Sequence, residues 1–185
     1  MKNLLNNENF EWLKSAFIAI IAVLVIRLFI FVPIIVDGES MESSLDNGDR
    51  MIVTKVGKIQ RFDIVVFHAN EKEDYIKRVI GLPGDKIEYK DDTLYINGEA
   101  YEEPYLDKNK QELRQLFGSG ALLTENFTLK SLLGLDRVPK DSLFVLGDNR
   151  RNSKDSRYIG VIPTSKVVGT TNVIYWPIKN IHLVD

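Results

Sequence analysis

The stretch DYIKRVIGLPGDKIEY, residues 74–89, shows the sequence pattern that recurs through the larger part of this chain. Its two ends, 74–80 and 85–89, are rich in Val, Ile and Tyr, the residues that favour pleated strands. Between them, GLPGD (81–85) combines glycine and proline in a way that is typical of a turn. The pattern therefore predicts a strand, a turn and a second strand.

The same pattern extends in both directions from this stretch. Further strands are predicted at RMIVTKV (50–56), FDIVVFH (62–68), SLFVLG (142–147) and VVGTTNVIYW (167–176). Residues 93–101, TLYINGEAY, place Asn97-Gly98 between apolar flanks, which indicates a tight β-hairpin. Because helical periodicity is scarce beyond the N-terminus, we expect a mostly β fold.

Residues 102–140 are more polar than the segments on either side of them. Their pattern predicts a helix over 108–117, followed by a Gly-Ser-Gly break at 118–120. We therefore expect 102–140 to form a small insertion or cap on the β domain.

An apolar run occupies the N-terminal part of the chain. From Ala16 to Val36 it contains 21 residues with a single charge, Arg27. As a helix, such a run would be about 30 Å long, the thickness of the hydrocarbon core of a bilayer. We expect a transmembrane anchor over residues 15–36, after a cytoplasmic segment, 1–14. In an alternative register the helix runs from Trp12 to Ile26 and leaves FIFVPIIV at the outer membrane surface.

The end of the apolar run argues against a cleaved secretory signal. The run is too long for the apolar region of a signal peptide, and its end, PIIVDGES, offers no A-x-A cleavage site. Pro33 would end or kink a helix that runs through this segment. Acidic residues follow the run, whereas Lys2 and Lys14 precede it, a bias that favours an N-terminus in the cytoplasm. Residues 37–185 are then expected to form an extracytoplasmic, β-rich domain.

The composition excludes several kinds of site. The chain has no cysteine, which excludes disulfides, thiol catalysis and cysteine-ligated zinc, and only two histidines, His68 and His182. Its net charge of −2 provides no basic surface for nucleic acid. We therefore expect no metal, no organic cofactor and no nucleic-acid partner.

Two residues suggest nucleophilic catalysis. Ser40 follows the apolar run in VDGESMESSL, where Gly38 favours a tight turn that exposes the hydroxyl group. Lys77 shares one face of its predicted strand with Tyr75 and Val79, and burial there would lower the pKa of its amine. Lowering it from about 10.4 to about 7–8 costs about 4 kcal/mol and yields a base able to deprotonate serine. Because neither histidine can be placed beside Ser40, a Ser–Lys pair is the simplest protease hypothesis. The alternatives are a serine in a polar loop and a lysine that reaches water from an edge strand.

The segment GDNRRNSKDSR, residues 147–157, is predicted to be a loop between two strands. It contains three arginines and two aspartates. Such a loop is either a solvated turn or a segment held rigid by Arg–carboxylate pairs.

These segments, in this order, resemble the bacterial type I signal peptidases. GESM (38–41) follows the anchor, and YIKRVIGLPGD (75–85) and GDNRRNSKDSR (147–157) come after it. The resemblance covers nearly the whole chain. It implies a membrane-bound serine endopeptidase that uses a Ser–Lys dyad to remove signal peptides from exported precursor proteins. Its partners would be those signal peptides and the lipid bilayer.

The resemblance also implies a role for each matching residue. Ser40 matches the nucleophile and Lys77 matches the general base. Seven further residues match positions that support them: Gly38 and Met41 beside the nucleophile, Tyr75 beside the lysine, Gly147 at the start of the loop, Ser153, whose hydroxyl orients the lysine, and the ion pair of Asp155 and Arg157. The oxyanion hole would use the backbone N–H of Ser40, since Gly38 stands where some members have a second, serine, donor.

Two departures from the family pattern concern the support of the nucleophile. SMESSL has Ser43 and Ser44 where the family has Pro and Thr, and RFD has Phe62 where the family has Gly. One alternative is therefore a catalytically weak or silent membrane-anchored β-domain that binds extracytoplasmic partners. Another is a self-cleaving regulator with the same Ser–Lys chemistry, although such proteins carry a DNA-binding domain in place of an anchor.

Overall fold

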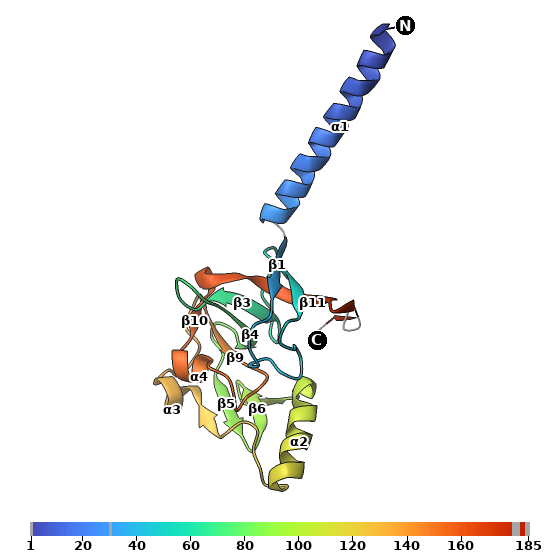
Figure 1. Cartoon of the computed structure of the whole chain (residues 1–185). Coiled ribbons are helices and arrows are strands. Elements are labelled where there is room, and N and C mark those ends of the chain that lie inside the picture. Colours follow the sequence, from blue (N-terminus) through green and yellow to red (C-terminus); the bar gives the residue numbers. More distant parts are fainter. Residues whose placement is uncertain (1, 30, 179–181, 184–185) are drawn as a thin grey trace.

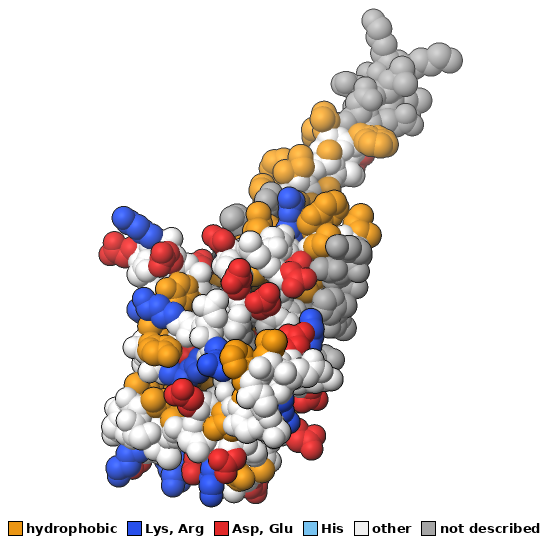
Figure 2. All heavy atoms as spheres, turned by 60° about the horizontal axis from the view of Figure 1, so that its bottom comes forward, with side chains coloured by type: hydrophobic (Ala, Val, Ile, Leu, Met, Phe, Trp, Pro, Cys, Tyr) orange, Lys and Arg blue, Asp and Glu red, His pale blue; other side chains and the backbone are white. Residues whose placement is uncertain are grey.

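The computed structural model of the chain describes residues 2–29, 31–178 and 182–183 (Figure 1). Helix α1, Lys2–Phe29, projects from a body that is built from two β-sheets. Apolar side chains gather along α1, whereas the visible face of the body carries acidic and basic side chains together (Figure 2). Among the described residues, no helix is both long enough and apolar enough to span a membrane. The anchor over 15–36 therefore stays a prediction.

The C-terminal end of the predicted anchor is a strand rather than a helix. β1, Phe31–Ile35, pairs antiparallel with β2, Arg50–Thr54, and Pro33 lies opposite Ile52. Proline lacks a backbone N–H and disrupts a helix, but an edge strand tolerates it. β1 lies at the edge of its sheet and therefore tolerates Pro33. A helix through this segment would not tolerate Pro33, which explains why α1 ends before it.

The larger sheet carries the strands that position the site. Among the described residues its strand order is β1-β2-β11-β3-β4-β9-β10, and β12 pairs with β11. The bounds of the remaining strands are β3 Ile64–His68, β4 Asp74–Gly81, β9 Ser142–Leu146, β10 Ile162–Pro163, β11 Val167–Trp176 and β12 His182–Leu183. Since β4 lies between β3 and β9, Lys77 does not reach water from an edge strand.

The smaller sheet has the strand order β7-β6-β5-β8 within the described part of the chain. Its strands are β5 Ile87–Lys90, β6 Thr93–Ile96, β7 Glu99–Tyr101 and β8 Phe127–Thr128. Between β6 and β7, Asn97 has φ of 55° and Gly98 has φ of 90°. Positive φ at both central positions is characteristic of the type I′ turn that Asn-Gly favours, and β6 pairs antiparallel with β7, so the predicted hairpin is confirmed.

The segment 102–140 combines short helices with one strand of the smaller sheet. It contains the 3-10 helix η1 (Pro104–Leu106), α2 (Asp107–Phe117), β8 and α3 (Leu129–Leu133). α2 agrees with the predicted helix to one residue, and Gly118, with φ of 93°, ends it. Because β8 pairs with β5, part of this segment is built into the sheet. Its interpretation as an insertion or cap stays a prediction.

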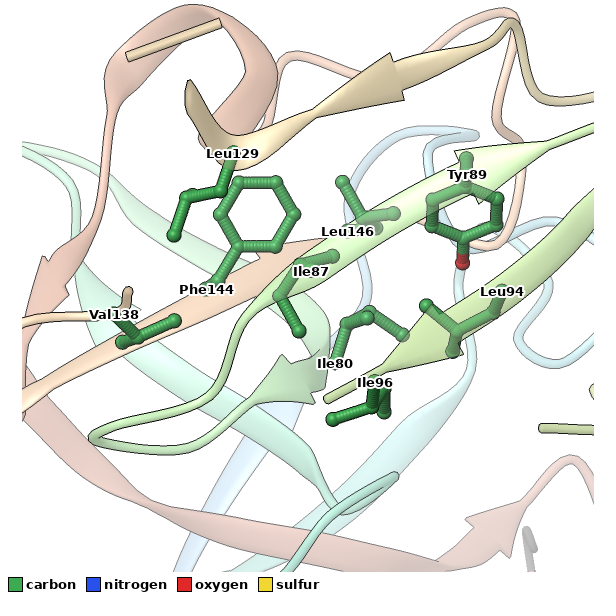
Figure 3. Close-up of a cluster of buried hydrophobic side chains, with 9 residues drawn as sticks. All are labelled: Ile80, Ile87, Tyr89, Leu94, Ile96, Leu129, Val138, Phe144 and Leu146. Atoms are coloured by element: carbon green, nitrogen blue, oxygen red, sulfur yellow. The ribbon is translucent and has the colours of Figure 1, made fainter. Parts of the chain in front are cut away.

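The two sheets meet around one cluster of buried side chains (Figure 3). β4 and β9 of the larger sheet contribute Ile80, Phe144 and Leu146, and the remaining members are Ile87, Tyr89, Leu94, Ile96, Leu129 and Val138. Each large apolar side chain stabilises the fold by about 1.5–3 kcal/mol when it is buried. The cluster therefore holds β4 and β9 firmly, and the loop over 147–157 starts from a rigid strand end.

Candidate active site

The structure brings Ser40 and Lys77 together although they are 37 residues apart in the chain. Ser40 lies in the turn after β1, and Lys77 lies on β4. The Lys77 amine, Nζ, donates a hydrogen bond to Ser40 Oγ at 2.7 Å and another to the backbone carbonyl of Ile76 at 2.9 Å. A base at this distance from a hydroxyl can take its proton directly.

Lys77 is almost completely buried, with 4% of its surface exposed. Burial lowers the pKa of the Lys77 amine from 10.5 to about 8, and the negative charges of Asp155 and Asp148 oppose this shift without reversing it. The centroid of the Tyr75 ring lies 5.2 Å from Nζ. Because loss of hydration penalises the ammonium form, a useful fraction of the amine is neutral near neutral pH.

Backbone contacts hold the turn that carries Ser40. Gly38 has φ of 105°, a conformation that favours glycine, and its N–H donates to Asn47 Oδ1 at 3.1 Å. Met41 is buried in an apolar cluster, and the Ser40 carbonyl accepts a hydrogen bond from the Asn149 N–H at 3.1 Å. Within the described structure no acceptor engages the Ser40 N–H. This donor is therefore available to a developing oxyanion.

The loop over 147–157 begins where β9 ends, and a buried carboxylate holds its two ends together. Asp155 accepts hydrogen bonds from the Gly147 N–H at 3.0 Å and from Arg157 Nη2 at 2.8 Å. It also caps α4, Ser156–Ile159, by accepting from the Arg157 N–H. Asp155 and Arg157 thus form an ion pair in the structure, and the loop is a rigid segment rather than a solvated turn.

Gly147 and Ser153 pack against each other beside Ser40. A Cβ atom on Gly147 would overlap the Ser153 side chain and would lie 2.5 Å from the Ser40 carbonyl oxygen. Close approach therefore requires glycine at this position. The Ser153 hydroxyl is buried and has no hydrogen-bond partner among the described residues. Its role in orienting the lysine stays a prediction.

A buried ion pair that the sequence does not reveal joins this loop to β4. Arg78 and Asp148 have fully buried side chains, and Arg78 Nη2 lies 2.9 Å from Asp148 Oδ2. Arg78 also donates to the Phe62 carbonyl at 3.0 Å and to Ser44 Oγ at 3.2 Å. The composition of the loop indicates Arg–carboxylate pairs, but the arginine that pairs with Asp148 lies on a strand 70 residues earlier in the chain.

A second buried ion pair joins the loop to the segment that follows β7. Arg150 donates to Glu103 Oε1 at 2.6 Å, to the Tyr89 hydroxyl at 2.7 Å and to the Gly147 carbonyl at 3.0 Å. Burial acts to raise the pKa of the Glu103 carboxyl, but the charge and hydrogen bonds of Arg150 lower it below its ordinary value. The loop is thus held by both sheets. No local pattern in the sequence marks Glu103 as the partner.

The two departures from the signal peptidase pattern have distinct structural consequences. Ser43 has φ of 88°, and proline, whose φ is held near −65°, does not fit this turn. Phe62 has φ of 70°, which glycine adopts easily, and its ring packs against Tyr101 and Tyr105 at centroid distances of 6.2 and 6.0 Å. Neither departure separates Ser40 from Lys77.

Ser40 and Lys77 lie in an open cleft of about 700 Å³. Residues 34–41 and residues 74–77 line it, together with Asn152 and Lys154 from the loop. Because 34–35 and 74–77 are strand residues, the cleft can accept an extended peptide. At the edge of the cleft His68 bonds Asp74 at 2.6 Å. Within the described structure no group of three His, Asp or Glu side chains could hold a metal ion.

The chain is similar along most of its length to known signal peptidases. A sequence model of the family described as "Signal peptidase, peptidase S26" matches residues 9–176. Signal peptidase I of Bacillus caldolyticus is 49% identical over 167 residues, which cover 88% of this chain and 89% of that protein. For signal peptidase I of Bacillus licheniformis the identity is 43% over 185 residues, with 97% and 95% covered. For signal peptidase IB of Staphylococcus aureus it is 40% over 181 residues, with 94% and 92% covered.

The fold is also similar to a solved structure. The crystal structure of a signal peptidase I from Enterococcus faecalis aligns with a TM-score of 0.58 and 42% sequence identity, and the alignment covers 62% of this chain and 97% of that chain. The prediction of a mostly β fold of this kind is confirmed.

Proposed function

The chain belongs to the signal peptidase family, peptidase S26, and from this premise we propose that Ser40 is its nucleophile and Lys77 its general base. It is a serine endopeptidase of the type I signal peptidase kind, which removes signal peptides by means of a Ser–Lys dyad. The observation that carries the residue assignment is the 2.7 Å hydrogen bond between Lys77 Nζ and Ser40 Oγ.

The proposed reaction uses one proton carrier in two half-reactions. Neutral Lys77 takes the proton of Ser40 Oγ as this oxygen attacks the carbonyl carbon of the scissile peptide bond. The Ser40 N–H stabilises the oxyanion, and the Lys77 ammonium then protonates the leaving amine of the mature protein. An ester between Ser40 and the signal peptide remains. Lys77 next deprotonates a water molecule, which attacks this ester. The Lys77 ammonium returns the proton to Ser40 Oγ as this oxygen leaves, so the signal peptide is released with a free carboxylate and the dyad is restored.

Seven residues support the dyad in this proposal. Gly38 and Met41 shape the nucleophile's turn, Tyr75 contributes to the low-polarity surroundings of Lys77, Gly147 allows the loop to approach Ser40, Ser153 orients the lysine, and Asp155 and Arg157 hold the loop. The proposal that Ser153 orients the lysine is supported by its buried hydroxyl, which has no hydrogen-bond partner among the described residues. A hydroxyl in that position is available to the ammonium form of the base.

We further propose that α1 anchors the enzyme in the cell membrane, with the N-terminus in the cytoplasm and residues 37–185 on the outer face. The support is the apolar run in the sequence and the exposure of apolar side chains on the described part of the helix. Phe17, Ile18 and Val23 are 64%, 66% and 61% exposed. A helix that is apolar around its circumference is stable in lipid rather than in water.

The direct test is cleavage of a precursor with an A-x-A site by the purified chain in detergent or lipid. We expect the wild type to cut at that site, and Ser40→Ala and Lys77→Ala to be inactive. The matched control is the double variant of Ser43→Ala and Ser44→Ala, which keeps the proposed nucleophile and should still cut. Cleavage by Ser40→Ala, or loss of cleavage in the double variant alone, would place the nucleophile elsewhere in the turn.

A further inference from the structure

We propose that the groove between α2 and the nucleophile's turn binds the first residues of the mature part of the precursor, beyond the bond that is cut. This inference rests on the proposed function, because it assigns a position to the part of the substrate that the cleft at Ser40 does not hold. The mature part would lie in the groove as an extended peptide with an apolar side chain.

The groove is a separate hollow of about 280 Å³. One wall is α2, with Lys108, Glu112 and Leu116, and the opposite wall is formed by Ser43 of the turn and Arg151 of the loop. Arg151 lies over the ring of the neighbouring Phe117, with its guanidinium carbon 5.7 Å from the ring centroid. The groove is thus bounded by rigid elements on both sides.

The groove continues the active-site cleft along the chain. The cleft is lined by residues 34–41, and the groove begins with the next residues, Glu42 and Ser43. Asn149 stands at the junction, because its side-chain amide donates both to the Glu39 carbonyl at 3.1 Å and to Glu42 Oε2 at 3.2 Å. A peptide that runs beside residues 34–40 past Ser40 therefore reaches the groove next.

The position of α1 indicates which end of the cleft the signal peptide enters and which end the mature part leaves. β1 connects α1 to the turn, so the end of the cleft at Ile34 is the end nearer to α1. A signal peptide that is held by the same membrane as α1 enters the cleft from that end. The mature part then leaves at the opposite end, where α2 and the groove lie.

The chemistry of the groove suits a short extended peptide. Its interior includes the buried side chains of Leu113 and Leu123, whereas Leu116, at its wall, is 76% exposed. From Lys108 to Leu116 the helix axis advances roughly 12 Å, which is the length of three to four residues of an extended chain. The charges of the lining have both signs, as in Lys108 and Glu112, so an apolar side chain contributes more to binding than a charge of either sign.

The kinetic test compares two peptides that share the signal sequence and the cleavage site. One ends two residues after the cut, and the other continues for ten residues with leucine among the first six. We expect the wild type to cut the long peptide with a kcat/KM about fivefold higher, mainly through KM. Leu116→Ser should abolish this preference, and Val56→Ser, at a position 63% exposed and outside both hollows, should keep it.

The outcomes separate the two proposals. If the wild type cuts both peptides equally well, or if Leu116→Ser keeps the preference for length, the groove proposal is wrong and the catalytic assignment stands. If the wild type cuts neither peptide, the proposed function fails, and this inference fails with it.

A cross-linking test uses the absence of cysteine from the chain. Leu116→Cys is introduced into the full-length Ser40→Ala variant, and the precursor carries one cysteine at mature position three to eight or, alternatively, in its signal sequence. We expect disulfides to the mature positions and none to the signal sequence. Disulfides to the signal sequence, between two copies of the chain, or equally with Val56→Cys would overturn the assignment of the groove.

Discussion

We expect catalysis to rise with pH through a midpoint of about 8, because Lys77 must lose its proton before it can act as a base. At pH 7, an amine with a pKa of about 8 is neutral in about one molecule in ten. An ordinary lysine with a pKa of 10.5 would be neutral in roughly one molecule in 3,000. Burial thus raises the concentration of the free base about 300-fold at this pH, which corresponds to about 3 kcal/mol.

The assay is kcat/KM for a precursor peptide between pH 6 and pH 10 in one detergent, since kcat/KM reports ionisations of the free enzyme. Its logarithm should rise with a slope of about one below pH 7 and level off above pH 9. Circular dichroism at each pH provides the control that the fold is intact. A midpoint near 10, or a rate that does not change with pH, would refute the idea that burial activates Lys77.

The same burial has a cost in stability whose sign can be measured. The folded chain holds the pKa of Lys77 at about 8, below the ordinary 10.5, so the unfolded chain binds more protons between these two pH values. The unfolding free energy should therefore increase across that window, by at most about 3 kcal/mol. Lys77→Met keeps the volume without the amine, so this variant should be inactive but more stable than the wild type at pH 7. Urea unfolding at pH 7 that shows Lys77→Met to be less stable would contradict this account.

Three further predictions concern the support of the site. Gly147→Ala should reduce kcat at least 100-fold, because its Cβ atom would displace the nucleophile's carbonyl oxygen, whereas Gly120→Ala, which meets no atom within 4 Å, should not. Equal kcat values for Gly147→Ala and Gly120→Ala would show that the close approach of Gly147 to the Ser40 carbonyl oxygen is unimportant. Ser43→Pro should cost about 3 kcal/mol in urea unfolding, because proline cannot adopt the φ of 88° found there. Ser43→Gly should cost less, because glycine adopts this φ easily, although it gives up the hydrogen bond from Ser43 Oγ to the Tyr105 carbonyl; the opposite order would mean that the turn has a different conformation. Asp148→Ala should destabilise by about 3–5 kcal/mol because it leaves Arg78 charged and buried, and adding Arg78→Met should recover part of that loss. If Asp148→Ala loses less unfolding free energy than the double variant of Asp148→Ala and Arg78→Met, then Asp148 and Arg78 are not coupled.

Local signals in the sequence were sufficient for most of the elements. Enrichment in Val, Ile, Tyr and Phe predicted the long strands, Asn97-Gly98 predicted the hairpin, and the predicted helix at 108–117 became α2. These signals work because strand propensity, turn chemistry and helix propensity depend on a few neighbouring residues. The two-residue strands β8, β10 and β12 were not predicted, since they exist only through pairing with partners elsewhere in the chain.

The amino-acid composition also limited the residue types that are available for chemistry. Without cysteine and with only two histidines, a serine nucleophile with a lysine base was the simplest hypothesis, and the resemblance located it at Ser40 and Lys77. Whether these two side chains meet, and whether the amine is neutral, was left to the tertiary structure. The 2.7 Å contact spans 37 residues, and the lowered pKa of Lys77 comes from burial between strands that are distant in sequence. Ion pairs such as that of Arg78 and Asp148 were decided in the same way, because a partner 70 residues away is chosen by packing and not by local pattern.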